Sequence, residues 1–152
     1  MTTTKAEECR TVQYELEIEI AAAPERVWKA VTDELSSWWL PDFHMLGEDS
    51  TMVFEPWAGG RLLEENGAKG LLWYQVLAID PPKMLALSGF TTPDFGGPAT
   101  SLLTLKLEAA GSGTKLTVQD GLFGQVSEQS VKSLQAGWTH LFTDGLKAFI
   151  ES

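Results

Sequence analysis

Asp120 and Arg61 are the two residues whose types and positions could support chemistry in this sequence. Asp120 follows Leu116 and Val118 at even spacing, and alternate residues of a strand share a face, so we expect its carboxylate to point into the core. A buried carboxylate needs a partner, and Arg61 is an available one. An ion pair between them would be structural or would orient a ligand. An inward but unpaired Asp120 would have a raised pKa and could act as a general acid.

The role of Arg61 depends on the face of its strand that it occupies. On the inner face, its guanidinium could hold a carboxylate or phosphate of a ligand through two parallel hydrogen bonds. On the outer face, it would form an exposed ion pair of little energetic weight.

Aromatic residues are the second feature, since the chain of 152 residues contains six tryptophans. Aromatic side chains bury large areas, so they could fill a core or line a cavity within it. Trp38 and Trp39 would point about 100° apart on a helix, so one is expected in the core and the other on the cavity or its rim. The candidate ligand-binding residues are Arg61, Asp120, Leu141 and the aromatics Trp38, Trp39, Phe43, Phe54, Trp57, Trp73, Phe90, Phe95 and Trp138.

The two histidines do not predict a metal site. His44 lies near Asp42, Glu48 and Asp49, but the spacing matches no known set of metal ligands. His140 lies off the centre of the apolar stripe of its helix, so we expect it at the surface or a rim. The sequence contains no serine elbow, phosphate-binding loop, His-Glu-x-x-His motif or cysteine pair. We therefore expect no metal and no cofactor, and the sequence identifies no nucleophile.

Charge and composition restrict the partners and the compartment. The net charge of −10 argues against a nucleic acid or an anionic membrane as a partner, because both carry negative phosphates. Cys9 is the only cysteine, so no intrachain disulfide can form, which suits a reducing compartment. The N-terminal residues contain no apolar signal segment, and no run of 18 apolar residues occurs. These features predict a cytoplasmic protein without a membrane span.

The elements that position these residues follow from hydrophobic periodicity. Residues 12–20 alternate without interruption between apolar and polar side chains, which predicts a strand with one wet face. Pro24 begins a short helix, and a second short helix ends before Pro41. Residues 127–152 form an amphipathic helix whose apolar stripe must be buried against a sheet. Residues 1–10 are expected to form a mobile tail, and residues 11–152 one domain. Further strands are expected at residues 51–54, 61–65, 71–79, 84–91, 101–108 and 114–122.

Six stretches resemble a known family. They are IEIAAAPERVWKAVTD from Ile18, SSWW from Ser36, FEPWAGGRLLEE from Phe54, VLAIDPPKMLALS from Val76, GTKLTVQDGLF from Gly113 and LQAGWTHLFTDGLKAFIE from Leu134. The order of elements resembles the helix-grip (START/Bet v 1-like) fold of the SRPBCC superfamily. The motifs resemble its branch named after the activator of Hsp90 ATPase homologue 1. This resemblance implies an α+β fold, with six or seven antiparallel strands curved around the C-terminal helix and an elongated cavity between them.

Three hypotheses for function remain open. The first, which the aromatic residues favour, is binding of a small, largely apolar molecule between sheet and helix without catalysis. The second is an enzyme of the cyclase, hydratase or hydrolase type that uses Asp120, Arg61, Glu65 or a histidine. The third is a co-chaperone-like interaction module. The sequence shows no second domain of the kind found in the eukaryotic co-chaperone, which disfavours a chaperone partner. The sequence leaves the oligomeric state open, a homodimer included.

Overall fold

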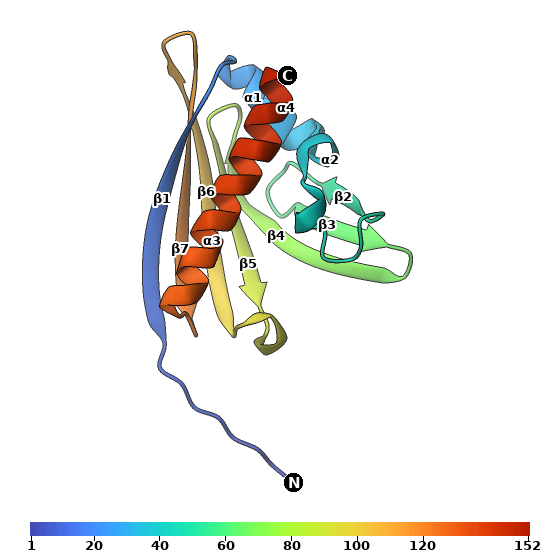
Figure 1. The fold of residues 1–152 in the computed structure, drawn as a ribbon, viewed down its shortest axis with the longest axis vertical. Coiled ribbons are helices and arrows are strands. Elements are labelled where there is room, and N and C mark those ends of the chain that lie inside the picture. The colour runs from blue at the N-terminus through green and yellow to red at the C-terminus, as the bar shows by residue number, and fades with distance from the viewer.

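Seven antiparallel strands form one sheet in the computed structural model, which describes residues 1–152 (Figure 1). The strands are β1 (Arg10–Ile20), β2 (Thr51–Phe54), β3 (Arg61–Asn66), β4 (Lys69–Asp80), β5 (Met84–Thr91), β6 (Ala99–Ala110) and β7 (Gly113–Gly124). Their order across the sheet is β1-β7-β6-β5-β4-β3-β2, so only β1 is out of sequence order. The predicted sheet of six or seven antiparallel strands is confirmed.

The alternating sequence of β1 determines which of its sides faces the core. Ile18 and Ile20 are buried, whereas Glu17 and Glu19 are exposed. The same period operates in β7, where Leu116 is completely buried. Because β1 and β7 pair antiparallel in regular register, their apolar faces coincide and form one end of the core.

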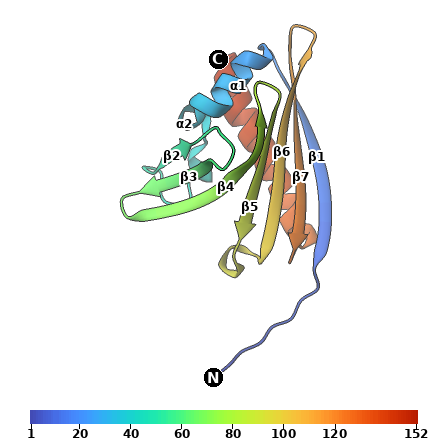
Figure 2. The ribbon, with the colours of Figure 1, turned by 180° about the vertical axis from the view of Figure 1, so that it is seen from behind.

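Two short helices follow β1, as the sequence predicts. Helix α1 (Pro24–Asp33) begins with a proline in its first turn, and α2 (Leu35–Trp38) follows directly. The indole nitrogen of Trp38 donates a 2.7 Å hydrogen bond to the carbonyl oxygen of Ala30, which fixes α2 against α1. From behind, both helices lie at the end of the sheet near the C-terminus (Figure 2). Short 3₁₀ helices, η1 (Pro41–Phe43) and η2 (Pro93–Phe95), complete the connections.

The C-terminal helix is continuous from residue 128 to residue 151 and changes its winding in the middle. Its parts are α3 (Glu128–His140), the π-helical segment η3 (Leu141–Lys147) and α4 (Ala148–Glu151). Ser127 caps it, accepting from the backbone N–H of Ser130, whose hydroxyl accepts from the backbone N–H of Ser127. A Cβ atom on Gly145 would lie 2.6 Å from the carbonyl oxygen of Trp38. Glycine is therefore needed at the point where the C-terminal helix packs against α2.

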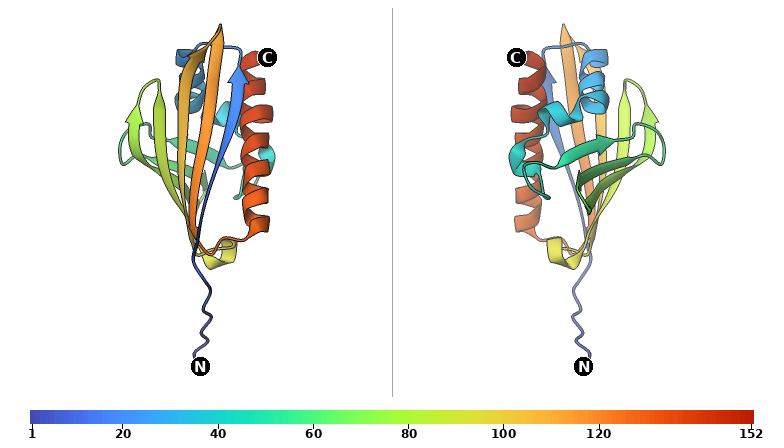
Figure 3. Two further views of the ribbon diagram at one scale, coloured as in Figure 1. Left: turned by 90° about the vertical axis from the view of Figure 1, so that its left-hand side faces the viewer. Right: turned by 90° about the vertical axis from the view of Figure 1, so that its right-hand side faces the viewer.

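The core lies between the curved sheet and this helix, which runs along one face of the sheet (Figure 3). One cluster of 23 buried residues includes side chains from α1, α2, the C-terminal helix and all seven strands. Residues 1–9 are exposed and adopt no regular structure, and Figure 1 shows them extending away from the sheet. No helix has both the length and the apolar character that crossing a bilayer requires.

Candidate functional site

A row of polar side chains crosses the inner face of the sheet over five neighbouring strands. The Tyr14 hydroxyl, on β1, donates a 2.8 Å hydrogen bond to Oδ2 of Asp120 on β7. The Ser101 hydroxyl, on β6, donates a 2.8 Å hydrogen bond to Oδ1 of the same carboxylate. The Tyr74 hydroxyl, on β4, lies 2.8 Å from the Ser101 Oγ. We call Tyr14, Asp120, Ser101 and Tyr74 the polar row.

Strand register and one glycine bring the polar row together. Tyr14 and Asp120 are directly paired between β1 and β7, so their side chains stand next to each other on one face. Tyr74 must reach over β5 to contact Ser101, and Gly89 lies under its ring. A Cβ atom on Gly89 would lie 2.7 Å from Cε1 of Tyr74 and 2.8 Å from the carbonyl oxygen of Trp73. Only glycine leaves room for this crossing without displacing the tyrosine ring.

Asp120 is inward and hydrogen-bonded, as the alternation along β7 predicts, and its exposed fraction is 2%. Burial raises the pKa of Asp120 above its ordinary value, and the hydrogen bonds from Tyr14 and Ser101 offset this only in part. Burial and the nearby Asp120 carboxylate also raise the pKa of Tyr14, while burial is the main cause of the raised pKa of Tyr74. The partners of the buried carboxylate are therefore neutral hydroxyl groups that remain protonated.

Of the two alternatives for Arg61, the exposed ion pair is the one observed, and Arg61 does not pair with Asp120. Arg61 lies on the exposed face of β3, where its Nε and Nη2 atoms bind the Glu55 carboxylate at 2.8 and 3.1 Å. The period of the strand explains this position, because Leu62 and Glu64 occupy the buried face and Arg61 must point the other way.

Trp138 of α3 lies over the sheet near the polar row and is 6% exposed. Its ring centroid is 6.2 Å from that of Tyr74 and 5.9 Å from that of Phe142. Its buried Nε1–H makes no hydrogen bond of normal geometry. The indole nevertheless lies close enough to Tyr14 and Asp120 to offset a part of the rise in the pKa of each. The predicted burial of Trp138 on the cavity side of the helix is confirmed.

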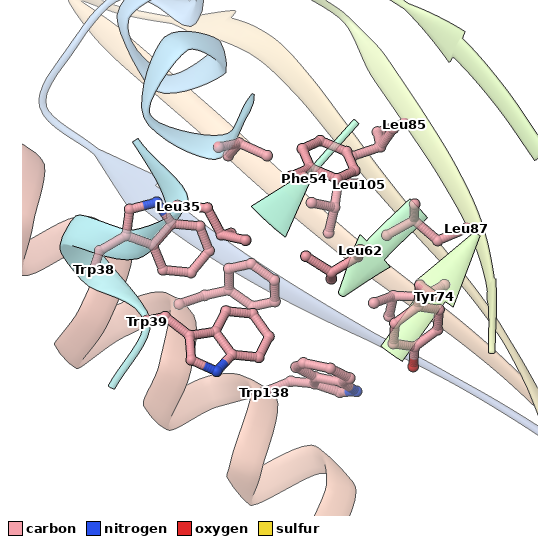
Figure 4. Close-up of a pocket in the computed structure, with 13 residues that line it drawn as sticks. Leu35, Trp38, Trp39, Phe54, Leu62, Tyr74, Leu85, Leu87, Leu105 and Trp138 are labelled. Atoms are coloured by element: carbon pink, nitrogen blue, oxygen red, sulfur yellow. The ribbon is translucent and has the colours of Figure 1, made fainter. Parts of the chain in front are cut away.

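Side chains nearly fill the enclosed space between sheet and helix. The enclosed cavity has a volume of about 30 Å³ and an entirely apolar lining (Figure 4). This volume is about a tenth of that of the smallest usual small-molecule sites, and a cavity with an apolar lining stays dry. The lining residues are Val31, Leu35, Trp38, Trp39, Phe54, Leu62, Tyr74, Leu85, Leu87, Leu103, Leu105, Trp138 and Phe142. The enclosed cavity is therefore much smaller than the elongated cavity that the family resemblance implies.

A larger pocket lies beside the enclosed cavity and opens to solvent. We call it the open pocket; its volume is about 300 Å³ and its lining is mostly apolar. Tyr74 and Trp138 line both spaces and so separate them. The residues around the open pocket are Met45, Leu71, Leu72, Trp73, Tyr74, Gly89, Phe90, Thr91, Phe95, Ser101, Leu122, Leu134 and Trp138.

The predicted ligand-binding residues are divided among these places. The enclosed cavity is lined by Trp38, Trp39 and Phe54. The open pocket is lined by Trp73, Phe90 and Phe95, and Trp138 lines both spaces. Asp120 lies behind the open pocket, bonded to its lining residue Ser101. Phe43 and Leu141 pack in or against the core and line neither space. Trp57 and Arg61 are exposed and line neither space, so the structure does not bring them to the site.

Trp38 and Trp39 are both buried and both line the enclosed cavity, so the expectation that only one would do so is wrong. The expected angle of about 100° applies within a helix. Helix α2 ends at Trp38, and Trp39 has extended backbone angles of φ −66° and ψ 113°. The change in backbone conformation turns the second indole back toward the cavity.

Glu64 is a buried charged residue to which sequence reasoning gave no role. It is fully buried and accepts hydrogen bonds from the backbone N–H groups of Met45 and Leu46, from the Ser50 hydroxyl and from Nε1 of Trp73, at 2.6–3.0 Å. Burial raises the pKa of Glu64, but these hydrogen bonds outweigh it, and the net pKa is below the ordinary value. The strand period predicts that Glu64 shares the inner face with Leu62. It does not predict which loop residues bind the carboxylate. Glu64 fixes the segment before β2 against β3.

The histidines occupy separate surroundings. His44 lies 2.6 Å from the Ser50 hydroxyl through its Nδ1 atom. His140 is at the surface, as expected, between Asp144 at 2.7 Å and Asp42 at 3.1 Å. The side-chain hydrogen bond to Asp144 is the main cause of the raised pKa of His140. No cluster of three or more histidine, cysteine or acidic side chains has an arrangement that could hold a metal ion.

Comparisons with known proteins identify the family. The family model described as "Activator of Hsp90 ATPase homolog 1-like protein" matches residues 21–151. No curated protein matches the sequence. The Mll3558 protein from Rhizobium loti is similar in structure, with a TM-score of 0.73 and 22% identity over 94% of this chain and 99% of that one.

Two further solved structures have the same fold. CalU16 from Micromonospora echinospora has a TM-score of 0.65 and 21% identity, covering 95% of this chain and 87% of that one. The Aha1 dimer from Colwellia psychrerythraea has a TM-score of 0.63 and 18% identity, covering 92% and 96%. At these identities the structures establish the helix-grip fold, and the family model establishes the family. The chain belongs to the activator of Hsp90 ATPase homolog 1-like family of the SRPBCC superfamily, as its motifs indicate.

Proposed function

We propose that this protein binds a small, largely apolar molecule in the open pocket. The observation that carries the proposal is a pocket of about 300 Å³ with a mostly apolar lining and a few polar groups, which is within the usual size range of small-molecule sites. The enclosed cavity, at about 30 Å³, is far below this range. The family and the fold are consistent with a ligand-binding START-like domain.

The position of the polar groups supports this proposal. Ser101 and Tyr74 line the open pocket, and their hydroxyls are bonded to each other at 2.8 Å. Phe90 and Phe95 are 71% and 57% exposed and also line it, so apolar surface is available at its mouth. A ligand that covers these rings would remove apolar area from water while its polar group meets the hydroxyl pair.

An enzyme is the second candidate, and the raised pKa of Asp120 favours it. Burial raises the pKa of Asp120, and a raised pKa is typical of a carboxyl that acts as a general acid. It does not line the open pocket, so a proton would have to reach a ligand through the hydroxyls of Ser101 and Tyr74. Binding requires no such relay, and we therefore place it first.

Fluorescence titration with the neutral apolar dye N-phenyl-1-naphthylamine tests the proposal. Leu134 lines the open pocket from α3, so Leu134→Trp should fill part of it and weaken dye binding by about tenfold or more. Ala136 is exposed on the same helix and lines neither space, so Ala136→Trp is the matched control and should bind like the original protein. Absence of dye binding, or equal weakening by both variants, would contradict the proposal.

A further inference from the structure

The hydrogen bonds of the polar row all run in one direction. The Ser101 hydroxyl carries a single hydrogen and donates it to Asp120 Oδ1 at 2.8 Å. The 2.8 Å contact between Tyr74 and Ser101 must therefore use the hydrogen of Tyr74. Tyr14 also donates to the carboxylate, at 2.8 Å. Each hydroxyl hydrogen in the row is directed toward Asp120, which leaves lone pairs on the side away from it.

Two of the three remaining side-chain donors around the open pocket are also occupied. Nε1 of Trp73 donates to Glu64 at 3.0 Å, and the Thr91 hydroxyl donates to the carbonyl oxygen of Ala99 at 3.3 Å. The third, the Nε1–H of Trp138, has no hydrogen-bond partner, but it is buried away from solvent, near Tyr14 and Asp120 of the polar row. The open pocket therefore offers side-chain hydrogen-bond acceptors but no unpaired side-chain donor that solvent reaches.

Tyr74 is the residue best placed to present an acceptor. Its ring lies against the enclosed cavity, and Figure 4 shows its hydroxyl oxygen pointing away from that cavity. The same residue and its partner Ser101 line the open pocket. With its hydrogen given to Ser101, the Tyr74 oxygen keeps a lone pair that can accept from a ligand.

We propose that the open pocket selects a neutral apolar alcohol or phenol, whose hydroxyl donates a hydrogen bond to the Tyr74 oxygen. This assignment of ligand class rests on the proposed function. An ether or ketone of the same shape brings only an acceptor, which would face the lone pairs of Tyr74 and lose its water. An anionic ligand would lose its water in a mostly apolar pocket, and no cationic side chain lines the pocket to compensate for its charge.

Displacement of N-phenyl-1-naphthylamine by two matched probes tests this selection. We expect 2-naphthol to compete about tenfold more strongly than 2-methoxynaphthalene, because only the naphthol can donate. Tyr74→Phe removes the acceptor and should reduce this ratio to about threefold or less. Ser101→Ala releases the hydrogen of Tyr74 into the pocket, so 2-methoxynaphthalene should gain affinity and the ratio should fall as well. The extra methyl group of the ether changes its affinity for every variant alike, so a comparison of the probe ratio between variants removes this contribution.

The outcomes separate this inference from the proposed function. If the dye binds and both probes displace it equally from the original protein, the inference is wrong and binding stands. If the dye does not bind at all, the proposed function fails, and the assignment of ligand class fails with it. An unchanged probe ratio in Ser101→Ala would overturn the assigned direction of the hydrogen bonds, even if Tyr74→Phe cannot be purified in folded form.

Discussion

Replacing Trp138 with alanine tests how the core and the site depend on one side chain. A buried tryptophan truncated to alanine costs about 3–5 kcal/mol of unfolding free energy. Trp138 is 6% exposed and packs between Tyr74 and Phe142, so this range applies. Two features place the expected loss of unfolding free energy near the lower end of this range. The indole nitrogen has no hydrogen-bond partner to leave unsatisfied, and the vacated space would join the open pocket instead of forming a sealed void.

We therefore expect Trp138→Ala to lose about 3 kcal/mol in urea denaturation. For a domain of this length, that loss corresponds to a fall of about 6–12 °C in Tm. Trp57→Ala is the matched control, because Trp57 is 57% exposed, and its effect should stay within about 0.5 kcal/mol. A loss below about 1 kcal/mol for Trp138→Ala, or an equal loss in the two variants, would refute the packing argument.

Three further substitutions test the polar row and the Glu64 network. Gly89→Ala should cost about 1–3 kcal/mol, because its Cβ would lie 2.7 Å from the Tyr74 ring; an unchanged urea midpoint would contradict this. Asp120 has a raised pKa in the folded protein, so its ionisation removes stability as the pH rises above its ordinary value of 3.8. Asp120→Asn lacks this loss, and its stability relative to the original protein should increase as the pH rises above 3.8 toward the raised folded pKa of Asp120; a constant difference would count against burial as the cause. Glu64→Gln should cost about 1–3 kcal/mol at neutral pH, since an amide cannot accept every hydrogen bond that the carboxylate accepts. Because the folded pKa of Glu64 is lowered, this difference should shrink as the pH falls through it, and denaturation curves at several pH values would show whether it does.

Local patterns were sufficient to predict the elements of this fold. The alternation along residues 12–20 predicts β1 and its buried face, and the even spacing of Leu116, Val118 and Asp120 predicts an inward carboxylate. The apolar stripe after Ser127 predicts the C-terminal helix, whose N-cap is that serine. Each of these predictions uses neighbours within a few residues, where side-chain direction follows from backbone geometry alone.

The partners of Asp120 depend on pairing between strands that are far apart in the sequence. Tyr14 and Asp120 are separated by 106 positions, and Ser101 and Tyr74 by 27. A strand period gives the face on which a residue lies, but not the strand that lies beside it or its register. Charge alone makes Arg61 a candidate partner, but its own strand period places it opposite the inward residues Leu62 and Glu64.

The buried carboxyl of Asp120 has an energetic cost that the fold alone does not require. An apolar residue at this position would continue the buried face formed by Leu116 and Val118 and would need no partner. Asp120 instead orients Ser101, and Ser101 orients Tyr74, at the edge of the one sizeable apolar pocket under the helix. Locally unfavourable residues concentrate where a protein binds or reacts with other molecules. The position of Asp120 is accounted for if the direction of these hydroxyl groups is what a ligand recognises.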